Sequence, residues 1–518
     1  MEALASWIEQ LSQPKRYPGG PEDVEIIQTH ISVVCIAGDD VYKLKKPVKL
    51  PFLDFSTPDL REHFCQEEVR LNQRLCPQIY RGVVPLYKTG EGVSFVHGPS
   101  AKIVDHAVLM ARLPHDRMLD ELLAKDAVSE SEIRGLARHM VAFHHRADRS
   151  TSTVLAGAPN GLHRLAANNF EELAELRENL FMPQLHDVLR DRNRQDFEEK
   201  LPLMEQRARE GFVMDGHGDL HARNICLTNP PAVYDCIEFN DSFRCEDVAT
   251  EHAFLVMDLR YRRHRALATA YLDEVISHSG DEQMRELIPM LVRYRAMVRA
   301  KVAAFTSSEE ECGPQARQSA AVSAQRYMNL AAITAVEDGQ PMVYLSCGLP
   351  GTGKTYVCEE LARQSGWTYV ASDHVRKELA DVPLDTEALA SAYTEAFSAR
   401  TYEEMIARAD RALALGPVIV DANYRSRDLR QRAINSARAL GARVCVLWFQ
   451  APEAVILERL SQREAGRDSA SDATTSVYEL LKATFEEPTD EEGAKLIKVN
   501  GAQSSDESIA HILCHAIG

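Results

Sequence analysis

The sequence predicts two domains of different fold class, a mixed α+β domain followed by an α/β domain with a parallel sheet. The chain has 518 residues, which is too long for one ordinary hydrophobic core. The segment "AVEDGQP" at 335–341 is charged and then carries Gly and Pro, so we expect a boundary there. Beyond it, strand-like and helix-like segments alternate, which favours parallel strands joined by right-handed crossovers. We therefore expect domains over 1–335 and 341–518, and we expect the second to fold alone.

The first domain begins with strands and one capped helix. "HISVVCIAGDDVYKLKK" (30–46) predicts two short strands joined at the turn residues Gly38, Asp39 and Asp40. "TPDLREHFCQEEVRLNQRL" (57–75) predicts a helix in which Thr57 is the cap and Pro58 the first residue. Further strands are expected at "GVVPLY", "VSFVHG" and "AVLMARL", followed by long helical segments over about 117–210 and 247–335.

The second domain shows strand-like runs separated by helical patterns. The runs are "MVYLSC" (342–347), "TYVAS" (368–372), "PVIVDA" (417–422) and "RVCVLWF" (443–449). Each is followed by a helix-like segment, which is typical of a parallel sheet.

The charge balance argues against a nucleic-acid partner. The formal net charge is -18, of which about -11 lies before residue 340 and about -7 after it. Binding to a polyanion needs clustered and unbalanced Lys and Arg. A local arginine groove is still compatible with this net charge, because net charge does not describe one face.

Cysteine usage and hydrophobic runs predict a cytoplasmic protein. The eleven cysteines are scattered without a CxxC pair, which favours reduced thiols over a disulfide framework or a zinc site. The N-terminal stretch has no apolar run of signal-peptide length, and no segment reaches the length of a membrane span. We expect no membrane partner, and the sequence does not indicate an oligomeric state.

The string "GLPGTGKT" (348–355) is a complete phosphate-binding loop placed between a strand and a helix. Gly348, Gly351 and Gly353 let backbone N–H groups surround phosphate oxygens, and the helix N-terminus adds partial positive charge. Lys354 is expected to reach the phosphates of ATP, and the Thr355 hydroxyl to hold Mg²⁺.

Other residues of this half have the chemistry of an acceptor site. Asp373 and Arg376 lie three apart on one helix face, where a base and an anion anchor for an acceptor hydroxyl compound would suit. Asp421 ends a buried-type strand and is a candidate Mg²⁺ ligand. Arg459 and Arg463, four apart on one helix face, could close over a transferring phosphoryl group. Each has a structural alternative, namely a helix cap or a solvated helix face.

The string "HGDLHARN" (217–224) and the later "VYDCIEF" give a second constellation for phosphoryl transfer. Asp219, Asn224 and Asp235 follow one another in the order base, metal ligand, metal ligand. A carboxylate would accept the proton of an acceptor hydroxyl, and the other two side chains would hold Mg²⁺ on the phosphates.

The C-terminal segments "GLPGTGKT", "SDHVRKEL", "VIVDANYRSRDLR" and "SDA" together resemble a group of small P-loop kinases. That group contains the kinase domain of phage polynucleotide kinase, gluconate kinase-like sugar-acid kinases and zeta toxins. The resemblance covers about 341–518 and implies that Asp373 is the base and Arg376 the acceptor anchor.

The N-terminal part resembles the aminoglycoside phosphotransferase-like kinases over roughly 20–330, because "HGD" replaces the His-Arg-Asp of protein kinases. This resemblance implies a bilobal protein-kinase-like fold in which His217 buttresses the loop and a strand lysine pairs with a helix glutamate. The lysine is Lys43 or Lys45 and the glutamate Glu67 or Glu68, of which we favour Lys45 and Glu68. Unlike the family pattern, no Gly-rich loop precedes the lysine strand. If the acceptor is cationic, four acids offer a binding wall or, alternatively, a solvated surface: Glu238, Asp241, Glu246 and Asp247.

The resulting hypothesis is a bifunctional ATP-dependent phosphotransferase whose two domains each act on a hydroxyl of a small molecule. Sugars, amino alcohols and sugar phosphates are the acceptor classes that the resemblances imply. Two alternatives remain for the P-loop half: a polynucleotide 5′-hydroxyl kinase, or an ATP-hydrolysing regulator of the N-terminal kinase.

Overall fold

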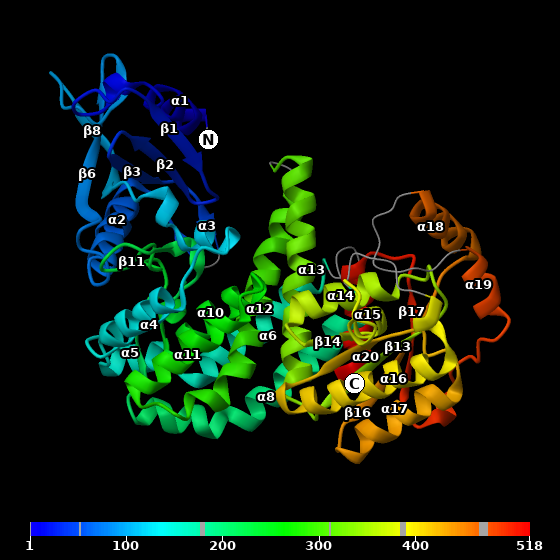
Figure 1. The fold of residues 1–518 in the computed structure, drawn as a ribbon. Coiled ribbons are helices and arrows are strands. Elements are labelled where there is room, and N and C mark those ends of the chain that lie inside the picture. Colours follow the sequence, from blue (N-terminus) through cyan, green and yellow to red (C-terminus); the bar gives the residue numbers. More distant parts are fainter. Residues whose placement is uncertain are drawn as a thin grey trace. The chain divides into compact units, whose positions relative to one another are not determined.

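The computed structural model describes residues 2–50, 53–176, 182–309, 312–383, 390–465 and 475–517. The chain forms two compact units, which share three of the described helices (Figure 1). Unit 1 comprises Met1–Arg164 and Glu199–Ile288, and unit 2 comprises Leu165–Glu198 and Pro289–Gly518. The shared helices are α6 (Pro159–Leu173), α8 (Pro183–Arg209) and α12 (Met284–Ser308). The domain boundary expected at 335–341 remains a prediction about independent folding.

Unit 1 begins with an antiparallel sheet that contains six of the described strands, in the order β1-β2-β3-β8-β6-β7. The strands are β1 (Val24–Gln28), β2 (Ser32–Ala37), β3 (Asp40–Lys45), β6 (Tyr80–Thr89), β7 (Gly92–Ser94) and β8 (Lys102–Ala111). The hairpin predicted from "HISVVCIAGDDVYKLKK" is confirmed as β2 and β3, and its turn uses Gly38 at a φ of 64°. Strand β1 was not predicted. A short pair, β4 (Lys49–Leu50) and β5 (Leu53–Asp54), follows β3.

Helix α2 (Pro58–Asn72) packs on β6 and β8, and its start confirms the predicted cap. The Thr57 hydroxyl accepts a hydrogen bond from the Leu60 amide, and Pro58 stands at the first helical position. This arrangement satisfies an orphan N–H and fixes where the helix begins. The buried face of α2 includes Glu68 and Asn72, which lie beside the candidate site.

The rest of unit 1 is helical, with two short ladders that shape the string "HGDLHARN" (217–224), here called the catalytic-loop string. The ladders pair β9 (Val213–Asp215) with β12 (Cys245–Asp247) and β10 (Ile225–Cys226) with β11 (Ala232–Val233). The other helices are α1 (Glu2–Leu11), α3 (Leu119–Ala124), α4 (Glu130–His144), α5 (Thr151–Ala156), α9 (Asp241–Arg244), α10 (Val248–Tyr261) and α11 (Arg265–Ser279).

Unit 2 contains a parallel sheet of five described strands, in the order β14-β15-β13-β16-β17. The strands are β13 (Met342–Cys347), β14 (Thr368–Ala371), β15 (Val418–Asp421), β16 (Arg443–Gln450) and β17 (Lys495–Asn500). The predicted parallel α/β sheet is confirmed. The strand order reverses at β13, so the carboxyl ends of β13 and its neighbours form the edge where α/β proteins bind ligands.

Helices cover both faces of this sheet (Figure 1). One face buries Val343 and Leu345 of β13 in a core with Met405 of α16 and Ile434 of α17. Helices α14 and α20 contact the sheet and each other, and both contact α13. The helices are α13 (Pro314–Glu337), α14 (Lys354–Ser365), α15 (Ser372–Leu379), α16 (Glu395–Ala412), α17 (Arg427–Ala439), α18 (Glu453–Ala465), α19 (Thr475–Lys482) and α20 (Ser505–Ile517).

The cysteines and the helices can be compared with what composition suggested. All eleven cysteines are free thiols, and all except Cys312 are buried. Among the described helices, none combines the length and the apolar character that crossing a bilayer requires.

Candidate active sites

In unit 1, the β10–β11 ladder brings Asn224 and Asp235 next to each other although they are eleven positions apart in the sequence. Ile225 pairs with Val233, and the Tyr234 amide donates to the Asn224 carbonyl at 3.0 Å. Both predicted metal ligands therefore emerge from the same end of the ladder. Asp235 has a φ of 63°, a conformation that costs a non-glycine residue free energy and often marks a functional position.

The predicted base Asp219 contacts Asn224 directly. The Asn224 Nδ2 group donates to the Asp219 carbonyl and to Asp219 Oδ2, both at 3.0 Å. His221 Nε2 lies 3.3 Å from the same carboxylate oxygen. The amide oxygen of Asn224 is thereby left for another ligand, and the Asp219 side chain keeps about a third of its surface exposed. The structure thus brings the predicted base beside the two predicted metal ligands.

His217 links the two loops of this site and is not itself exposed. Its Nε2 group donates to the Tyr234 carbonyl at 2.9 Å, and its Nδ1 atom accepts from the Asp219 amide at 3.3 Å. Burial lowers the pKa of His217, in agreement with this neutral tautomer. The Glu251 carboxylate of α10 accepts from the His217 amide at 2.8 Å. The predicted buttressing role of His217 agrees with these contacts.

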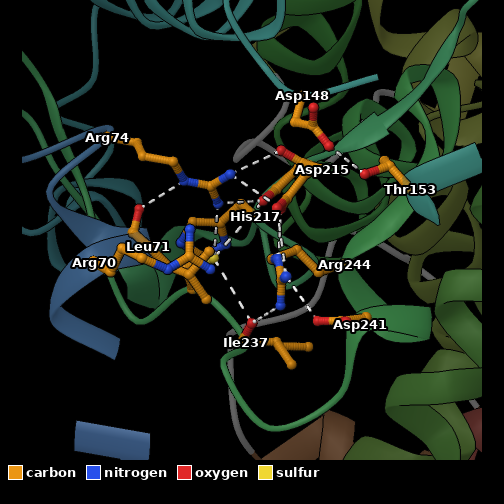
Figure 2. Close-up of polar contacts among 12 residues, drawn as sticks. Arg70, Leu71, Arg74, Asp148, Thr153, Asp215, His217, Ile237, Asp241 and Arg244 are labelled. Carbon is orange, nitrogen blue, oxygen red and sulfur yellow. Dashed lines mark hydrogen bonds and ion pairs between the residues drawn. The ribbon is translucent and has the colours of Figure 1, made fainter. Parts of the chain in front are cut away.

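Two arginines hold the start of the catalytic-loop string, as Figure 2 shows. Arg74, just after α2, donates to the carbonyls of Asp215 and Gly216 at 3.0 and 2.8 Å. Arg244 forms an ion pair with Asp215 and donates to the Ile237 carbonyl at 2.9 Å. These contacts connect α2, the 215–219 loop and the 235–238 segment. Sequence reasoning missed both arginines, because nothing local marks an arginine whose partners lie far along the chain.

A chain of alternating charges runs from β3 to the 235–238 segment. Lys43 and Lys45 share one face of β3, and their Nζ atoms lie 2.8 and 2.7 Å from the two carboxylate oxygens of Glu68. Lys43 also contacts Asp235, and Lys45 also contacts Glu238. The order is therefore Asp235, Lys43, Glu68, Lys45, Glu238. The predicted Lys–Glu pair is present, but both lysines take part in it.

The surroundings of the two lysines separate their roles. The Asp235 side chain beside Lys43 is 43% exposed, whereas the Glu238 side chain beside Lys45 is 5% exposed. Burial lowers the pKa of Lys43, but the negative charges of Asp235 and Glu68 raise it by more than burial lowers it. The pKa of Lys43 therefore lies well above the usual range. Burial raises the pKa of Glu68, but the two lysines lower it to about 2. The role of Lys45 as the nucleotide lysine stays a prediction, and Lys43 lies at the more exposed end of the charge chain.

The four acids that might have formed a wall for a cationic acceptor are occupied or buried. Glu238 is paired with Lys45, and Asp241 accepts from Arg244 at 2.8 Å. Asp247 forms a two-bond pair with the fully buried Arg207, and Glu246 is 6% exposed. Three of these acids are thus buried within unit 1, whereas the Asp241 side chain is 73% exposed.

In unit 2, the glycines of the phosphate-binding loop adopt backbone conformations that other residues avoid. Gly348, Gly351 and Gly353 have φ values of 142°, 80° and 94°. A Cβ atom at Gly348 would lie 2.6 Å from the Phe449 carbonyl oxygen. The loop therefore needs glycine both for its backbone angles and for space. Helix α14 begins directly after it at Lys354.

Lys354 and Asp421 lie at the edge formed by the strand ends. Lys354 Nζ donates to the Leu349 carbonyl at 2.9 Å, so its stem curls over the loop. Burial lowers the pKa of Lys354, and Asp421 partly offsets that effect. The Asp421 carboxylate accepts from Ser346 Oγ at 2.6 Å and from the Tyr369 hydroxyl at 2.8 Å. Thr355 is exposed in the first turn of α14.

The predicted acceptor residues have mixed placements. Asp373 is half-buried in the first turn of α15, and its negative charge partly offsets the lowering of the Lys354 pKa by burial. Arg376 is 8% exposed, donates to the Ala392 carbonyl at 2.8 Å and stacks on the ring of Tyr393. Among the described residues, its Nε group has no hydrogen-bond acceptor.

Arg459 of α18 lies against the phosphate-binding loop, where it donates to the Gly351 carbonyl at 3.3 Å. Arg463 belongs to the same helix, but its side chain and the "SDA" string at 471–473 lie outside what the structure describes.

The donor atoms at both sites suit Mg²⁺. Amide, carboxylate and hydroxyl oxygens of Asn224, Asp235, Asp421 and Thr355 are hard ligands of the kind that Mg²⁺ takes. No group of three or more His, Cys, Asp or Glu side chains forms a metal cage among the described residues. Mg²⁺ at a nucleotide needs only one or two protein ligands, because phosphates and water supply the rest.

Comparison with known proteins agrees with the P-loop geometry. Residues 343–488 match the family model described as an AAA domain. With the loop and the parallel sheet, this match identifies a P-loop nucleotide-binding domain.

Two uncharacterized mycobacterial proteins match nearly the whole chain. They are Rv2004c of Mycobacterium tuberculosis and Mb2027c of Mycobacterium bovis. Each is 30% identical over 470 residues, a match that covers 89% of this chain and 90% of the relative.

Some solved structures resemble about a third of the chain. A gluconokinase from Sinorhizobium meliloti is 22% identical, with a TM-score of 0.25, and the match covers 34% of this chain and 91% of that one. Kti12 of Chaetomium thermophilum, in complex with ADP-AlF3, is 18% identical, with a TM-score of 0.26, and the match covers 34% of this chain and 99% of that one.

Proposed function

We propose that the chain, which belongs to the family of the mycobacterial proteins Rv2004c and Mb2027c, carries two ATP-dependent phosphotransferase sites. Each site would transfer the γ-phosphoryl group of ATP to a hydroxyl of a small molecule. The observation that supports this most is the joint presence of a P-loop edge in unit 2 and the Asp219–Asn224–Asp235–Lys43 arrangement in unit 1. Phosphoryl transfer mainly needs positioning and charge neutralisation, and both groups supply them.

In unit 1, the residues divide the work by their positions. Asp219 would accept the proton of the acceptor hydroxyl, because its carboxylate is partly exposed and held by Asn224. Lys43 would bind phosphate oxygens, since its ammonium group lies at the exposed end of the charge chain. Asn224 and Asp235 would hold Mg²⁺, which neutralises phosphate charge when it is bound.

In unit 2, backbone N–H groups of 348–355 and Lys354 would hold the phosphates, and Asp421 and Thr355 would hold Mg²⁺. Asp373 is the proposed base and Arg376 the proposed acceptor anchor. An acceptor base has no use in a pure ATP-hydrolysing regulator, so its presence favours a kinase over that alternative.

The polynucleotide kinase alternative finds less support. Arg430 is fully buried in a two-bond pair with Glu492, and Arg432 pairs with Asp428 at 2.8 Å. The arginines available for a nucleic-acid channel are Arg425, Arg427, Arg430 and Arg432, and two of these four are thus paired with carboxylates within the unit. The acceptor of unit 2 is therefore proposed to be a small molecule with at most one anionic group.

The test is a screen of ATP consumption against sugars, sugar acids and phosphates, amino alcohols, nucleosides and 5′-hydroxyl oligonucleotides. It is run on the wild type and on Asp219→Asn and Lys354→Ala. Each change should abolish one acceptor-dependent activity by at least about 10²-fold, since the base and the phosphate lysine act in the transition state. The other activity should stay within about twofold. Loss of both activities in either folded variant would contradict two independent sites.

A further inference from the structure

The second lysine of β3, Lys45, is almost inaccessible although it lies beside the candidate site of unit 1. The Lys45 side chain is 1% exposed, and its ammonium group contacts the carboxylates of Glu68 and Glu238. The ring of Phe55 covers it, with the ring centre 4.9 Å from Nζ. Lys43 also contacts two carboxylates, but its partner Asp235 is 43% exposed, whereas both carboxylate partners of Lys45 are buried. Lys45 therefore has a buried partner set that is complete without a ligand.

Glu238 lies three residues after Asp235, on a segment that is anchored at every position. The Asp235 amide donates to the Tyr80 hydroxyl at 3.1 Å, and the Cys236 amide donates to Asn72 Oδ1 at 2.9 Å. The Ile237 amide donates to the His217 carbonyl at 3.1 Å. The first three anchors bind backbone atoms, and the fourth is the Lys45–Glu238 side-chain pair. That pair fixes the segment to β3, the strand that also carries Lys43.

Burial makes this fourth anchor rigid. Both members are nearly inaccessible, and a buried ion pair leaves an uncompensated charge when one partner is removed. Glu68 contacts Lys43 and Lys45 through different oxygens, so Lys43 keeps its own carboxylate contact when Lys45 is removed. The Lys45–Glu238 pair therefore acts mainly on the 235–238 segment, and with it on Asp235.

We propose that Lys45 and Glu238 form a positioning pair, which binds no substrate and holds Asp235 for the metal ion that accompanies a bound nucleotide. The proposal rests on the phosphotransferase function proposed for unit 1. It predicts that damage to the pair weakens the contribution of Mg²⁺ to nucleotide binding more than it weakens the contact between phosphate and Lys43.

The experiment uses the full chain with Lys354→Ala, so that the P-loop site is silent, and measures ADP binding calorimetrically with and without Mg²⁺. Lys45→Met and Glu238→Gln are compared with Lys43→Met. Asp105→Asn is the control, because it breaks the buried Arg61–Asp105 pair in the same sheet and helix region. Circular dichroism verifies folding, and the nearly isosteric Glu238→Gln carries the test if Lys45→Met does not fold.

We expect Lys45→Met and Glu238→Gln to leave Mg²⁺-free ADP affinity within about twofold and to reduce the Mg²⁺-dependent gain about tenfold. Lys43→Met should weaken binding in both conditions, and Asp105→Asn should change neither. The double variant Lys45→Met/Glu238→Met should lose no more than Lys45→Met alone, since the two residues act as one unit.

Three outcomes would overturn the proposal. If Lys45→Met weakened Mg²⁺-free binding as much as Lys43→Met does, Lys45 would contact the nucleotide. If the Mg²⁺-dependent gain in both single variants equalled that of Asp105→Asn, the pair would only stabilise the fold. If the Lys354→Ala protein bound no ADP while the Asp219→Asn protein did, the phosphotransferase function of unit 1 would fail and the pair would have no site to position.

Discussion

The candidate sites of unit 1 and unit 2 are built from different parts of the chain. In unit 2 the surface is backbone: six consecutive residues, 348–353, three of them glycines with positive φ, form the loop between β13 and α14. In unit 1 the surface is side chain: Lys43, Glu68 and Asp235 meet from three separate segments. A backbone site depends on local conformation, whereas a side-chain site depends on the packing of the whole unit. The two sites should therefore respond differently to truncation, to pH and to single substitutions.

The largest expected effect concerns truncation of unit 2. Helix α13 packs on α14 and α20, where Arg326 lies 3.2 Å from Asp506 and Asn329 donates to the Asp506 carbonyl. Trp367 donates to Glu337 at the end of α13. A fragment of 341–518 would expose the face of α14 and α20 that α13 covers. These contacts count against independent folding of that fragment, which remains a prediction.

We predict that 312–518 is more stable than 341–518 by at least about 4 kcal/mol, because Tyr327, Met328 and Leu330 are buried on α13. Urea unfolding of both fragments, read by circular dichroism, measures the difference. Equal unfolding midpoints would show that α13 contributes nothing and would restore the boundary at 335–341.

The next effect is a pH dependence that belongs to unit 1. Glu68 is buried, which raises its pKa, but the two lysines lower it from 4.5 to about 2. Its contribution to stability is therefore complete above pH 4.5 and lost as the pH falls from 4.5 towards 2, where the carboxylate takes up a proton. The shift corresponds to roughly 3 kcal/mol in total.

Glu68→Gln is the matched variant, because it keeps the shape and removes the titration. The difference in unfolding free energy between wild type and Glu68→Gln should shrink by roughly 2 kcal/mol between pH 4.5 and pH 3. Urea unfolding followed by hydrogen exchange in β3 and α2 reports on unit 1 alone. A difference that does not change with pH would mean that the carboxylate is not paired in solution.

The sequence predicts the backbone site of unit 2 better than the side-chain site of unit 1. The P-loop residues lie within one octapeptide, so spacing alone placed Gly348, Lys354 and Thr355 correctly between a strand and a helix. β13 to β16 were predicted as well, because each is a run of apolar residues. Strand β17 was missed, since its pattern "KLIKVN" alternates with lysines and resembles a surface segment.

For unit 1, the sequence placed the strand, the helix and the loop but not their contacts. Glu68 and Lys45 are 23 residues apart, and Lys45 and Glu238 are 193 apart. No periodicity encodes such a pairing, because it arises only when the sheet, α2 and the 235–238 segment pack together. The alternation of strand residues put Lys43 and Lys45 on one face, and only packing distinguishes them.

A smaller effect tests the backbone character of the unit 2 site. Gly348 and Gly416 have similar φ values, 142° and 137°, but a Cβ atom meets the Phe449 carbonyl at Gly348 and open space at Gly416. In both alanine variants, backbone strain should lower the free energy of unfolding by about 1 kcal/mol. In Gly348→Ala, displacement of the loop should lower the free energy of unfolding by about 1 kcal/mol more.

Nucleotide affinity separates the two variants more sharply. We predict about tenfold weaker ADP binding for Gly348→Ala in the Lys43→Met background, which weakens the nucleotide site proposed for unit 1, and no change for Gly416→Ala, which precedes β15 at the opposite end of the strands. Calorimetric titration measures both. Equal affinities would show that the loop tolerates a side chain and that its glycines serve only chain flexibility.

The smallest expected effect concerns the arginines of α17. Arg432 and Asp428 form an exposed i, i+4 pair on this helix, and such pairs contribute little. Arg432→Ala should therefore change the unfolding free energy by less than about 0.5 kcal/mol and the P-loop activity by less than twofold.

A nucleic-acid groove would behave otherwise, since each phosphate contact adds a slope of roughly -0.9 to the logarithm of affinity against the logarithm of salt. Fluorescence anisotropy of a labelled 5′-hydroxyl oligonucleotide, measured from low to moderate salt on wild type and Arg432→Ala, tests this difference. We expect no salt-sensitive binding by either protein, because Arg430 is buried against Glu492 and Arg432 already has a carboxylate partner. Steep salt dependence that Arg432→Ala makes shallower would instead assign these arginines to a polyanion and would favour polynucleotide phosphorylation by unit 2.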